Sequence, residues 1–382
     1  MRKKTRLVIL LVCVACFFVI APILVLYSMG YRFDFEKMEI TSTGGIYVRT
    51  YPAAGEIIVD SKITEKPGMF SNSIFVQSLL PKDHTVLVEK SGYYDYLKTI
   101  PVQKNQVTKL ENVLLIKKNM QFEVLTDLTT QTGKTTQGLP SPFNKQEKFI
   151  IKNNNLYYSD APENSGLPAV QKSTPVLKKI LAFALQNNNI IWIGTDGFLY
   201  KSDLANLTAS PIKLILTPIK IVKTGSYKII NNNSNIFIDN NSNLLFLNTK
   251  TNNLDNFDAP VKDAKISPDG ASIIFYNDNN IYVSLISTAA PKKNILYKSS
   301  EKITDCLWLN NNYIIFTAGN KILISETDYR GNINSEILPQ TIVISPGKEI
   351  NIKNPEIFFN QQDGKLYILT NKILMSSEKI TP

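Results

Sequence analysis

A strand–turn–strand unit that recurs through the C-terminal two-thirds of the chain constrains the fold more than any other feature. Each unit has two short apolar runs separated by a polar turn, and the units occupy residues 149–158, 190–200, 236–247, 273–285, 313–324 and 366–375. From Leu156 in the first unit to Ile373 in the last, the mean period is about 43 residues. A repeat of this length is typical of the four-stranded blades of a β-propeller, because a lone hairpin cannot bury its faces.

The repeat therefore predicts a β-propeller over residues 119–382. Six hairpins favour six blades, and residues 122–128 are expected to add a strand to the last blade and so close the ring. Seven blades stay open as an alternative, with further strands in residues 174–187 or 339–358.

The stretch Lys265–Leu285 contains the clearest copy of the repeat. Its turn Ser267-Pro268-Asp269-Gly270 resembles the turn of TolB-like and WD40-like propellers, and Ser141-Pro142-Phe143-Asn144 resembles a degraded copy. The acidic and amide residues at these tips suit the left-handed positions of tight turns. Because the equivalent tips carry unrelated residues, such as Thr195-Asp196-Gly197, we interpret them as turn residues and not as catalytic ones.

An uncharged apolar run, Leu7–Tyr27, follows a short basic tail. About 20 apolar residues are enough to cross the hydrocarbon core of a bilayer as a helix. We therefore expect a single-pass signal anchor over residues 7–29 in a cell membrane. The four positive charges of residues 1–6 place that tail in the cytoplasm and the domains that follow outside it.

Residues 45–118 alternate as strands and predict a small β-sandwich, joined to the anchor by a linker over residues 30–44. This stretch resembles the PEGA domain, an extracytoplasmic β module of bacteria and archaea. The resemblance rests on residues 51–60, 80–88 and 90–93, which read YPAAGEIIVD, LPKDHTVLV and KSGY. The chain departs from the family pattern where Gly55 follows the alanines, and where Ser61 and Asp83 stand in place of glycine.

Charge and cysteine content exclude several classes of protein. The net charge is +10, but the basic residues are nearly all lysine and form no stripe interleaved with aromatic residues, so we expect no nucleic-acid partner. Cys13 and Cys16 lie in the apolar run, which leaves Cys306 without an intrachain disulfide partner. The chain also has no Gly-x-Ser-x-Gly elbow and no phosphate-binding glycine loop.

Three other features invite a chemical interpretation, and for each we favour a structural one. His84 is the only histidine, and a lone imidazole without a positioned carboxylate or cysteine makes no catalytic triad. Residues 239–243 match the first ligands of a calcium loop, but Leu244 and Lys250 replace its glycine and glutamate. Trp192 and Trp308 stand in strands and are expected in the core. We therefore predict no catalytic, cofactor-binding or metal-binding residues and no cofactor, and the ligand-binding residues stay unknown.

Two functions are compatible with these features. The first is a membrane-anchored, non-enzymatic binding or scaffold protein that presents the propeller to an envelope protein or a cell-wall polymer; this is also what the resemblance to PEGA and TolB-like families implies. The alternative is an envelope enzyme, a glycan hydrolase or lyase, with its site in the propeller channel. It requires two carboxylates within about 10 Å of each other. The available candidates are Asp196, Asp239, Asp269, Asp278 and Glu326.

Overall fold

The computed structural model describes residues 3–68, 71–127, 149–158, 175–222, 225–232, 234–240, 243–258, 260–286, 293–345 and 348–381. They form two compact units. Unit 1 comprises Met1–Asn119, Arg330–Asn334 and Pro382, and unit 2 comprises Met120–Tyr329 and Ser335–Thr381.

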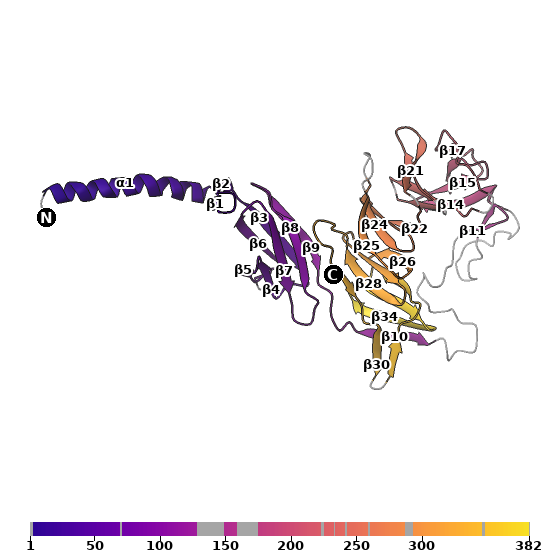
Figure 1. Cartoon of the computed structure of the whole chain (residues 1–382). Coiled ribbons are helices and arrows are strands. Elements are labelled where there is room, and N and C mark those ends of the chain that lie inside the picture. The colour runs from indigo at the N-terminus through magenta and orange to yellow at the C-terminus, as the bar shows by residue number, and fades with distance from the viewer. Residues whose placement is uncertain are drawn as a thin grey trace. The chain divides into compact units, whose positions relative to one another are not determined.

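Unit 1 begins with the helix α1, Lys3–Ser28, in the apolar run predicted to be helical (Figure 1). The most apolar 18-residue stretch of its segment Thr5–Ser28 has a mean hydropathy of 3.2 and is 0% buried. At about 1.5 Å per residue the segment is long enough, by length and composition, to cross a hydrocarbon core of about 30 Å.

A two-stranded hairpin follows the helix after Met29 and Gly30. It pairs β1, Tyr31–Asp34, with β2, Glu39–Ser42, in an antiparallel ladder. The carboxylate of Asp34 fixes the turn, because it accepts a hydrogen bond from the backbone N–H of Glu36 at 2.9 Å. Residues 30–44, expected to be a linker, thus hold regular structure, and apolar and acidic residues alternate on both sides of the turn, in Phe33-Asp34-Phe35 and in Met38-Glu39-Ile40.

The rest of unit 1 is a β-sandwich of the kind expected. Its strands are β3 (Gly44–Tyr51), β4 (Glu56–Val59), β5 (Ile63–Glu65), β6 (Ser73–Leu79), β7 (Asp83–Glu89), β8 (Tyr96–Pro101) and β9 (Val107–Leu114). One sheet has the order β6-β3-β9, with β3 and β9 parallel, and the other has the order β5-β4-β7-β8. Alternate residues of both sheets, among them Val48 and Val86, meet in one core.

Unit 2 consists of six consecutive sheets and one separate hairpin in the residues described. The sheets are built from β11–β13 (Phe149–Lys152, Asn155–Tyr158, Leu177–Lys178), β14–β17 (Ile180–Gln186, Asn189–Gly194, Leu199–Asp203, Ile212–Lys213), β18–β21 (Lys228–Asn231, Ile236–Asp239, Leu244–Asn248, Asn253–Asp258), β22–β25 (Asp263–Ile266, Ser272–Tyr276, Asn280–Leu285, Lys293–Lys298), β26–β29 (Ile303–Trp308, Tyr313–Ala318, Lys321–Glu326, Ser335–Ile337), and β32–β34 (Glu356–Asn360, Lys365–Thr370, Ile373–Lys379) with β10 (Phe122–Asp127).

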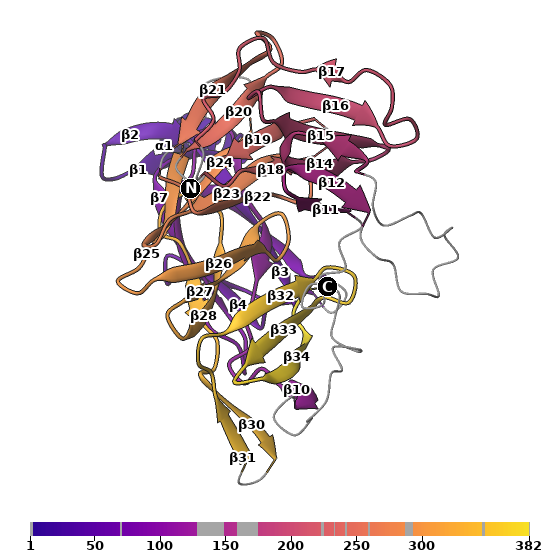
Figure 2. The same cartoon turned by 90° about the vertical axis from the view of Figure 1, so that its right-hand side faces the viewer.

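Each sheet is an antiparallel meander, and each of the six expected hairpins forms two neighbouring strands of one sheet. The sheets follow one another in chain order (Figure 2). The strand expected from residues 122–128 is also present, since β10 pairs with β34 at the other end of unit 2. The chain therefore has the mainly β, propeller-type architecture predicted from the repeat.

The two segments that kept a seventh blade open contain strands, but in the part of the chain described they add a two-stranded sheet and no further sheet of three or four strands. Residues 174–187 supply β13 and β14 to two adjacent sheets. Residues 339–358 form the hairpin of β30 (Thr341–Ser345) and β31 (Lys348–Asn351), and then the start of β32. The degraded copy at Ser141-Pro142-Phe143-Asn144 lies outside the described residues.

Candidate functional site

Charged side chains gather on the first strands of three successive sheets of unit 2. Lys228 begins β18, Asp263 and Lys265 lie on β22, and Asp305 lies on β26. Residues two apart in a strand share one face, so Asp263 and Lys265 point the same way. First strands of neighbouring sheets, such as β18 and β22, contact each other, which brings side chains from different repeats together.

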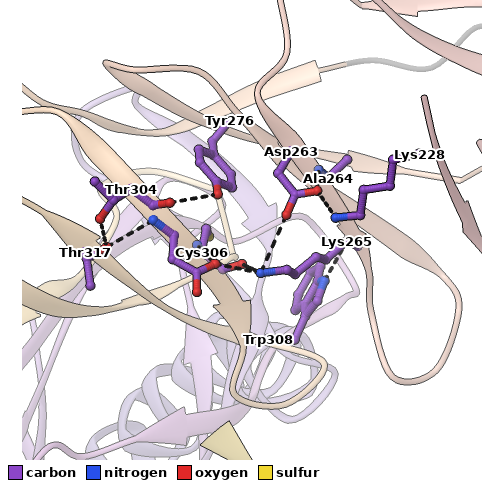
Figure 3. A network of polar contacts seen from close by, with 10 residues as sticks. Lys228, Asp263, Ala264, Lys265, Tyr276, Thr304, Cys306, Trp308 and Thr317 are labelled. Carbon is purple, nitrogen blue, oxygen red and sulfur yellow. Dashed lines mark hydrogen bonds and ion pairs between the residues drawn. The ribbon is translucent and has the colours of Figure 1, made fainter. Parts of the chain in front are cut away.

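These side chains form a continuous chain of ion pairs from sheet to sheet (Figure 3). The ammonium of Lys228 pairs with Asp263, whose other oxygen lies 3.8 Å from Lys265 Nζ. Lys265 Nζ also lies 2.7 Å from Asp305 Oδ1 and donates to the carbonyl of Cys306 at 2.8 Å. Two cations and two anions therefore neutralise one another across three sheets.

Three hydroxyl groups, those of Tyr276, Thr304 and Thr317, adjoin the charged side chains. Tyr276 donates its hydroxyl to the carbonyl of Thr304 at 3.2 Å, and the hydroxyl oxygens of Thr304 and Thr317 lie 2.6 Å apart. Thr317, which is fully buried, accepts the backbone N–H of Asp305 at 3.0 Å. Lys265 completes the contact between β22 and β26, since its carbonyl accepts the indole N–H of Trp308 at 2.8 Å.

Burial disfavours ionisation of the Tyr276 hydroxyl and of the Cys306 thiol. It raises the pKa of the Tyr276 hydroxyl well above its ordinary value, and the neighbouring carboxylates Asp263 and Asp305 add to the effect. Burial likewise raises the pKa of the Cys306 thiol, which is fully buried. A reactive cysteine needs a thiolate and access to solvent, so Cys306 lacks both properties of a nucleophile.

Asp263 and Asp305 meet the distance condition set for the enzyme alternative. Both carboxylates contact the same nitrogen, Lys265 Nζ, so they lie within the separation of about 10 Å used by paired catalytic carboxylates. The lysine between them changes their role, because each carboxylate already has an ammonium partner. The arrangement satisfies the geometry of a glycosidase pair but not its need for an unpaired acid and base.

Neither aspartate was among the five carboxylates considered from the sequence. A usable signal was present, since Asp263 and Asp305 are separated by almost one repeat period and both stand on the strand that precedes a hairpin. The lysines gave no such signal, because their partners are set by the approach of separate sheets.

Two of the five candidate carboxylates are turn residues, as expected. Asp196 accepts the backbone N–H of Phe198 at 3.1 Å and the hydroxyl of Tyr200 at 2.6 Å, and this hydrogen bond raises the pKa of Tyr200 to about 12. Asp269 accepts the hydroxyl of Ser267 at 2.6 Å and the N–H of Ala271 at 3.0 Å.

Of the other three carboxylates, Asp239 adjoins the network of Figure 3, since it is opposite Lys228 in the β18–β19 ladder and its charge adds to the raised pKa of Tyr276. Asp239 and Glu326 are buried at the ends of β19 and β28. Asp278 is more than half exposed and forms ion pairs with Lys262 at 3.4 Å and Lys302 at 3.6 Å. Among the five, Asp239 is thus placed beside Lys228 and Tyr276.

His84 differs from the sequence-based expectation, because it does have a positioned carboxylate. Its Nδ1 lies 2.6 Å from Asp60 Oδ2, and its Nε2 lies 2.7 Å from the carbonyl oxygen of Leu80. Burial raises the pKa of Asp60, but hydrogen bonds from the Thr85 N–H and His84 outweigh it and lower the pKa below its ordinary value. Since His84 is only 3% exposed, the pair ties β7 to the β4–β5 turn.

The two tryptophans are buried, as predicted, and the described part of the calcium-like loop makes a turn contact. Trp192 is 8% exposed and stacks on Tyr200 with ring centroids 4.4 Å apart, and Trp308 is 6% exposed. Asn240 accepts the N–H of Asn243 at 2.8 Å, which is a turn contact, while residues 241–242 lie outside the described part. The described residues contain no group of three or more metal-ligating side chains.

Unit 1 has an open groove of about 430 Å³ that is distant in sequence from the charged network. It is lined by residues of both charges, including Glu56, Glu89 and Lys90. Glu56 is paired with Lys66 at 2.7 Å, and Lys90 donates to the carbonyl of Ala53 at 2.7 Å. Two of the charged groups that line the groove are therefore engaged within unit 1.

Comparison with known proteins identifies one part of the chain. Residues 43–117 match the PEGA domain. The match covers the sandwich of β3 to β9, about a fifth of the chain, and agrees with the resemblance in the motifs around Asp60 and His84. No curated protein matches the chain.

Several solved structures are similar over part of the chain. The β-propeller domain of Myceliophteria thermophila Cps50 (Swd1) aligns at 11% identity and a TM-score of 0.36, over 50% of this chain and 62% of that one. Kuenenia stuttgartiensis hydrazine synthase aligns at 16% identity and a TM-score of 0.38, over 57% and 68%. The extracellular domain of a putative hybrid two-component system, BT4673 from B. thetaiotaomicron, aligns at 11% identity and a TM-score of 0.41, over 61% and 31%.

Proposed function

We propose that this chain is a membrane-anchored, extracytoplasmic binding or scaffold protein, in which α1 crosses the membrane and the propeller binds an envelope protein or a cell-wall polymer. The observation that carries the proposal is α1: a segment of 24 residues, with its most apolar stretch unburied, leads directly into β domains. A helix of this length and composition is long and apolar enough to cross a hydrocarbon core.

The charge of the N-terminus supports the orientation. Arg2, Lys3, Lys4 and Arg6 precede the apolar run, and basic residues at one end of a span favour the cytoplasmic side for that end. The PEGA match over residues 43–117 supports an extracytoplasmic location for the part that follows.

Binding is favoured over catalysis by the charged network of unit 2. The carboxylates of Asp263 and Asp305 are neutralised by Lys228 and Lys265, and the nearby thiol of Cys306 is buried. The enzyme alternative, a glycan hydrolase or lyase, would have to release one of these carboxylates from its ammonium partner before acid–base work.

The proposal is tested by crosslinking the full-length protein in intact cells and identifying captured proteins by mass spectrometry. The matched control is a chain that lacks residues 120–382 but keeps α1 and the PEGA domain. We expect partners, or crosslinked cell-wall fragments, that the full chain captures and the control does not. Identical captures from both chains would contradict a binding role for the propeller.

A second assay separates the enzyme alternative. Purified full-length protein is incubated with envelope polysaccharide, and released fragments are measured for the wild type and for Asp263→Asn and Asp305→Asn. Release that both substitutions abolish would favour the enzyme over the binding protein.

A further inference from the structure

The hairpin of β1 and β2 has one face that is tied to unit 1 and one that is apolar and exposed. Phe33 and Ile40 are opposite each other in the ladder and are 41% and 58% exposed. At the turn, Phe35 is 80% exposed and Met38 is 73% exposed. Phe33 and Phe35 contact each other edge to face, with centroids 4.9 Å apart, so the exposed residues form one continuous apolar surface.

The opposite face of the hairpin is polar and held in place. Arg32 donates to the hydroxyl of Ser78 on β6 at 3.0 Å, and Glu36 forms an ion pair with Lys82 at 2.7 Å. Asp34 is 3% exposed. Because these contacts join the hairpin to the PEGA sandwich, its apolar surface has a fixed direction within unit 1.

The hairpin is also attached closely to the end of α1. Arg32 donates to the carbonyl of Tyr27 at 2.9 Å, and its guanidinium lies 3.4 Å above the ring of that tyrosine. The carbonyl of Gly30 accepts both the backbone N–H of Thr43, at 2.9 Å, and its hydroxyl, at 2.7 Å. A cation at a helix C-terminus is favourable, and these bonds leave no loose tether between helix and hairpin.

The length of the connection decides what covers the apolar surface. Two residues lie between Ser28 and Tyr31, so the connection spans at most about 11 Å, and it is shortened because the N–H groups of Met29 and Gly30 donate back to the carbonyls of Val25 and Tyr27. The polar layer of a bilayer adds about 5–8 Å on each side of the hydrocarbon core. If α1 crosses the membrane, the hairpin therefore lies at the depth of the lipid headgroups, where aromatic side chains are enriched.

We infer that the β1–β2 hairpin places Phe33, Phe35, Met38 and Ile40 in the headgroup–acyl boundary of the bilayer and so docks the PEGA domain on the lipid surface in one orientation. The inference rests on the proposed membrane anchor and adds a second, interfacial contact to it. An apolar surface of this kind binds by inserting about 5–10 Å below the headgroups.

The test uses the full-length protein reconstituted into phosphatidylcholine vesicles, with Phe35→Trp as the probe. Phe35→Trp keeps an aromatic ring at a largely exposed position. The matched control is Tyr93→Trp. The start of β9 pairs with Gly45, close to the hairpin, whereas Tyr93 pairs with Lys117 beyond the other end of β9, so Tyr93 lies at the end of the sandwich remote from the hairpin. The native Trp192 and Trp308 are buried and contribute the same background to both variants.

Tryptophan emission is compared in vesicles of unmodified lipid and of lipid brominated near the top of the acyl chains. We expect the additional emission of Phe35→Trp to fall at least about twofold in brominated lipid, with a weaker effect for bromines near the chain ends, and that of Tyr93→Trp to stay unchanged. Each sample is also extracted with alkaline carbonate, which releases proteins that do not span the bilayer, so the fraction retained tests separately whether α1 spans it.

Protein that resists carbonate but shows no quenching of Phe35→Trp would overturn the hairpin inference and leave the anchor standing. Equal quenching of both variants would also overturn it, because it would show no preferred orientation. Release of the full-length protein by carbonate would overturn the anchor itself and, with it, the position of the hairpin.

Discussion

The turn between β4 and β5 makes a sharp prediction about stability. Asp60 and Ser61 have φ angles of 54° and 55°, and the N–H of Lys62 donates to the carbonyl of Val59 at 3.1 Å. Two successive left-handed residues closed by this bond form a type I′ turn, whose preferred second residue is glycine. Ser61 stands where the PEGA pattern has that glycine, so Ser61→Gly should stabilise the turn.

The size of the gain follows from two opposing terms. A left-handed conformation costs a residue with a Cβ about 1–2 kcal/mol. Glycine loses more conformational freedom on folding, which offsets about 0.5–1 kcal/mol of that gain. Ser61 is exposed and its hydroxyl makes no recorded contact in the described part of the chain, so we expect a net stabilisation of about 0.5–1 kcal/mol.

Hydrogen exchange measured by mass spectrometry suits this test, because peptides from β4 and β5 report on the turn within the intact, detergent-solubilised chain. A stabilisation of about 0.5–1 kcal/mol should slow their exchange about 2–5-fold. Ser61→Ala is the matched control, since it removes the hydroxyl but keeps the Cβ and should give no gain. Peptides from β33 and β34 should not change in either variant.

Two results would refute this reasoning. Exchange in Ser61→Gly as fast as in the wild type would show that the left-handed conformation carries no appreciable strain. An equal gain in Ser61→Ala would assign the effect to the hydroxyl and not to the Cβ.

Three further predictions concern the polar contacts. Because the pKa of Asp60 is lowered in the folded state, its carboxylate stabilises the fold above the ordinary pKa of about 4, and this contribution is lost as the pH falls through the folded pKa. The melting temperature should therefore fall between about pH 5 and 2, and Asp60→Asn should abolish that part of the pH dependence. A double-mutant cycle of Lys265→Met and Asp305→Asn should give a coupling of about 1 kcal/mol in the free energy of unfolding, because the two side chains are close but about a third exposed. Additive effects of the two substitutions would contradict a direct interaction between them. Thr317→Val should destabilise unit 2 by about 1–3 kcal/mol, since it leaves the N–H of Asp305 without its buried acceptor, whereas an unchanged melting temperature would show that water replaces the hydroxyl.

Most of the fold was predictable because it depends on local patterns. Apolar alternation around a polar turn specified each hairpin of unit 2, and the period of about 43 residues indicated four strands per sheet. The outer strands were harder to find: β13 and β17 have two residues each, too few to show alternation. The β1–β2 hairpin was missed because its exposed apolar face resembles neither a core strand nor a polar loop.

The candidate site was largely unpredictable for a physical reason. The partner of Asp305 is Lys265, 40 residues earlier, and the partner of His84 is Asp60, in the β4–β5 turn. Such pairs depend on which sheets or strands become neighbours and not on residue type. His84 illustrates the consequence, since the same imidazole is inert alone and strongly engaged once β4 and β7 bring Asp60 to it.

The charged network and the apolar core of unit 2 perform different tasks. Phe257 packs edge to face against Phe237 of its own sheet and against Phe275 of the next sheet, with ring centroids 5.2 and 5.7 Å apart. Apolar contacts of this kind are strong but tolerate sliding, because burial has no fixed direction. An ion pair at 2.7 Å, such as that of Lys265 with Asp305, is lost when one sheet shifts by a residue, since strands alternate their faces. The network therefore favours one register between three sheets, and a scaffold that displays loops for binding requires that fixed geometry more than it requires additional stability.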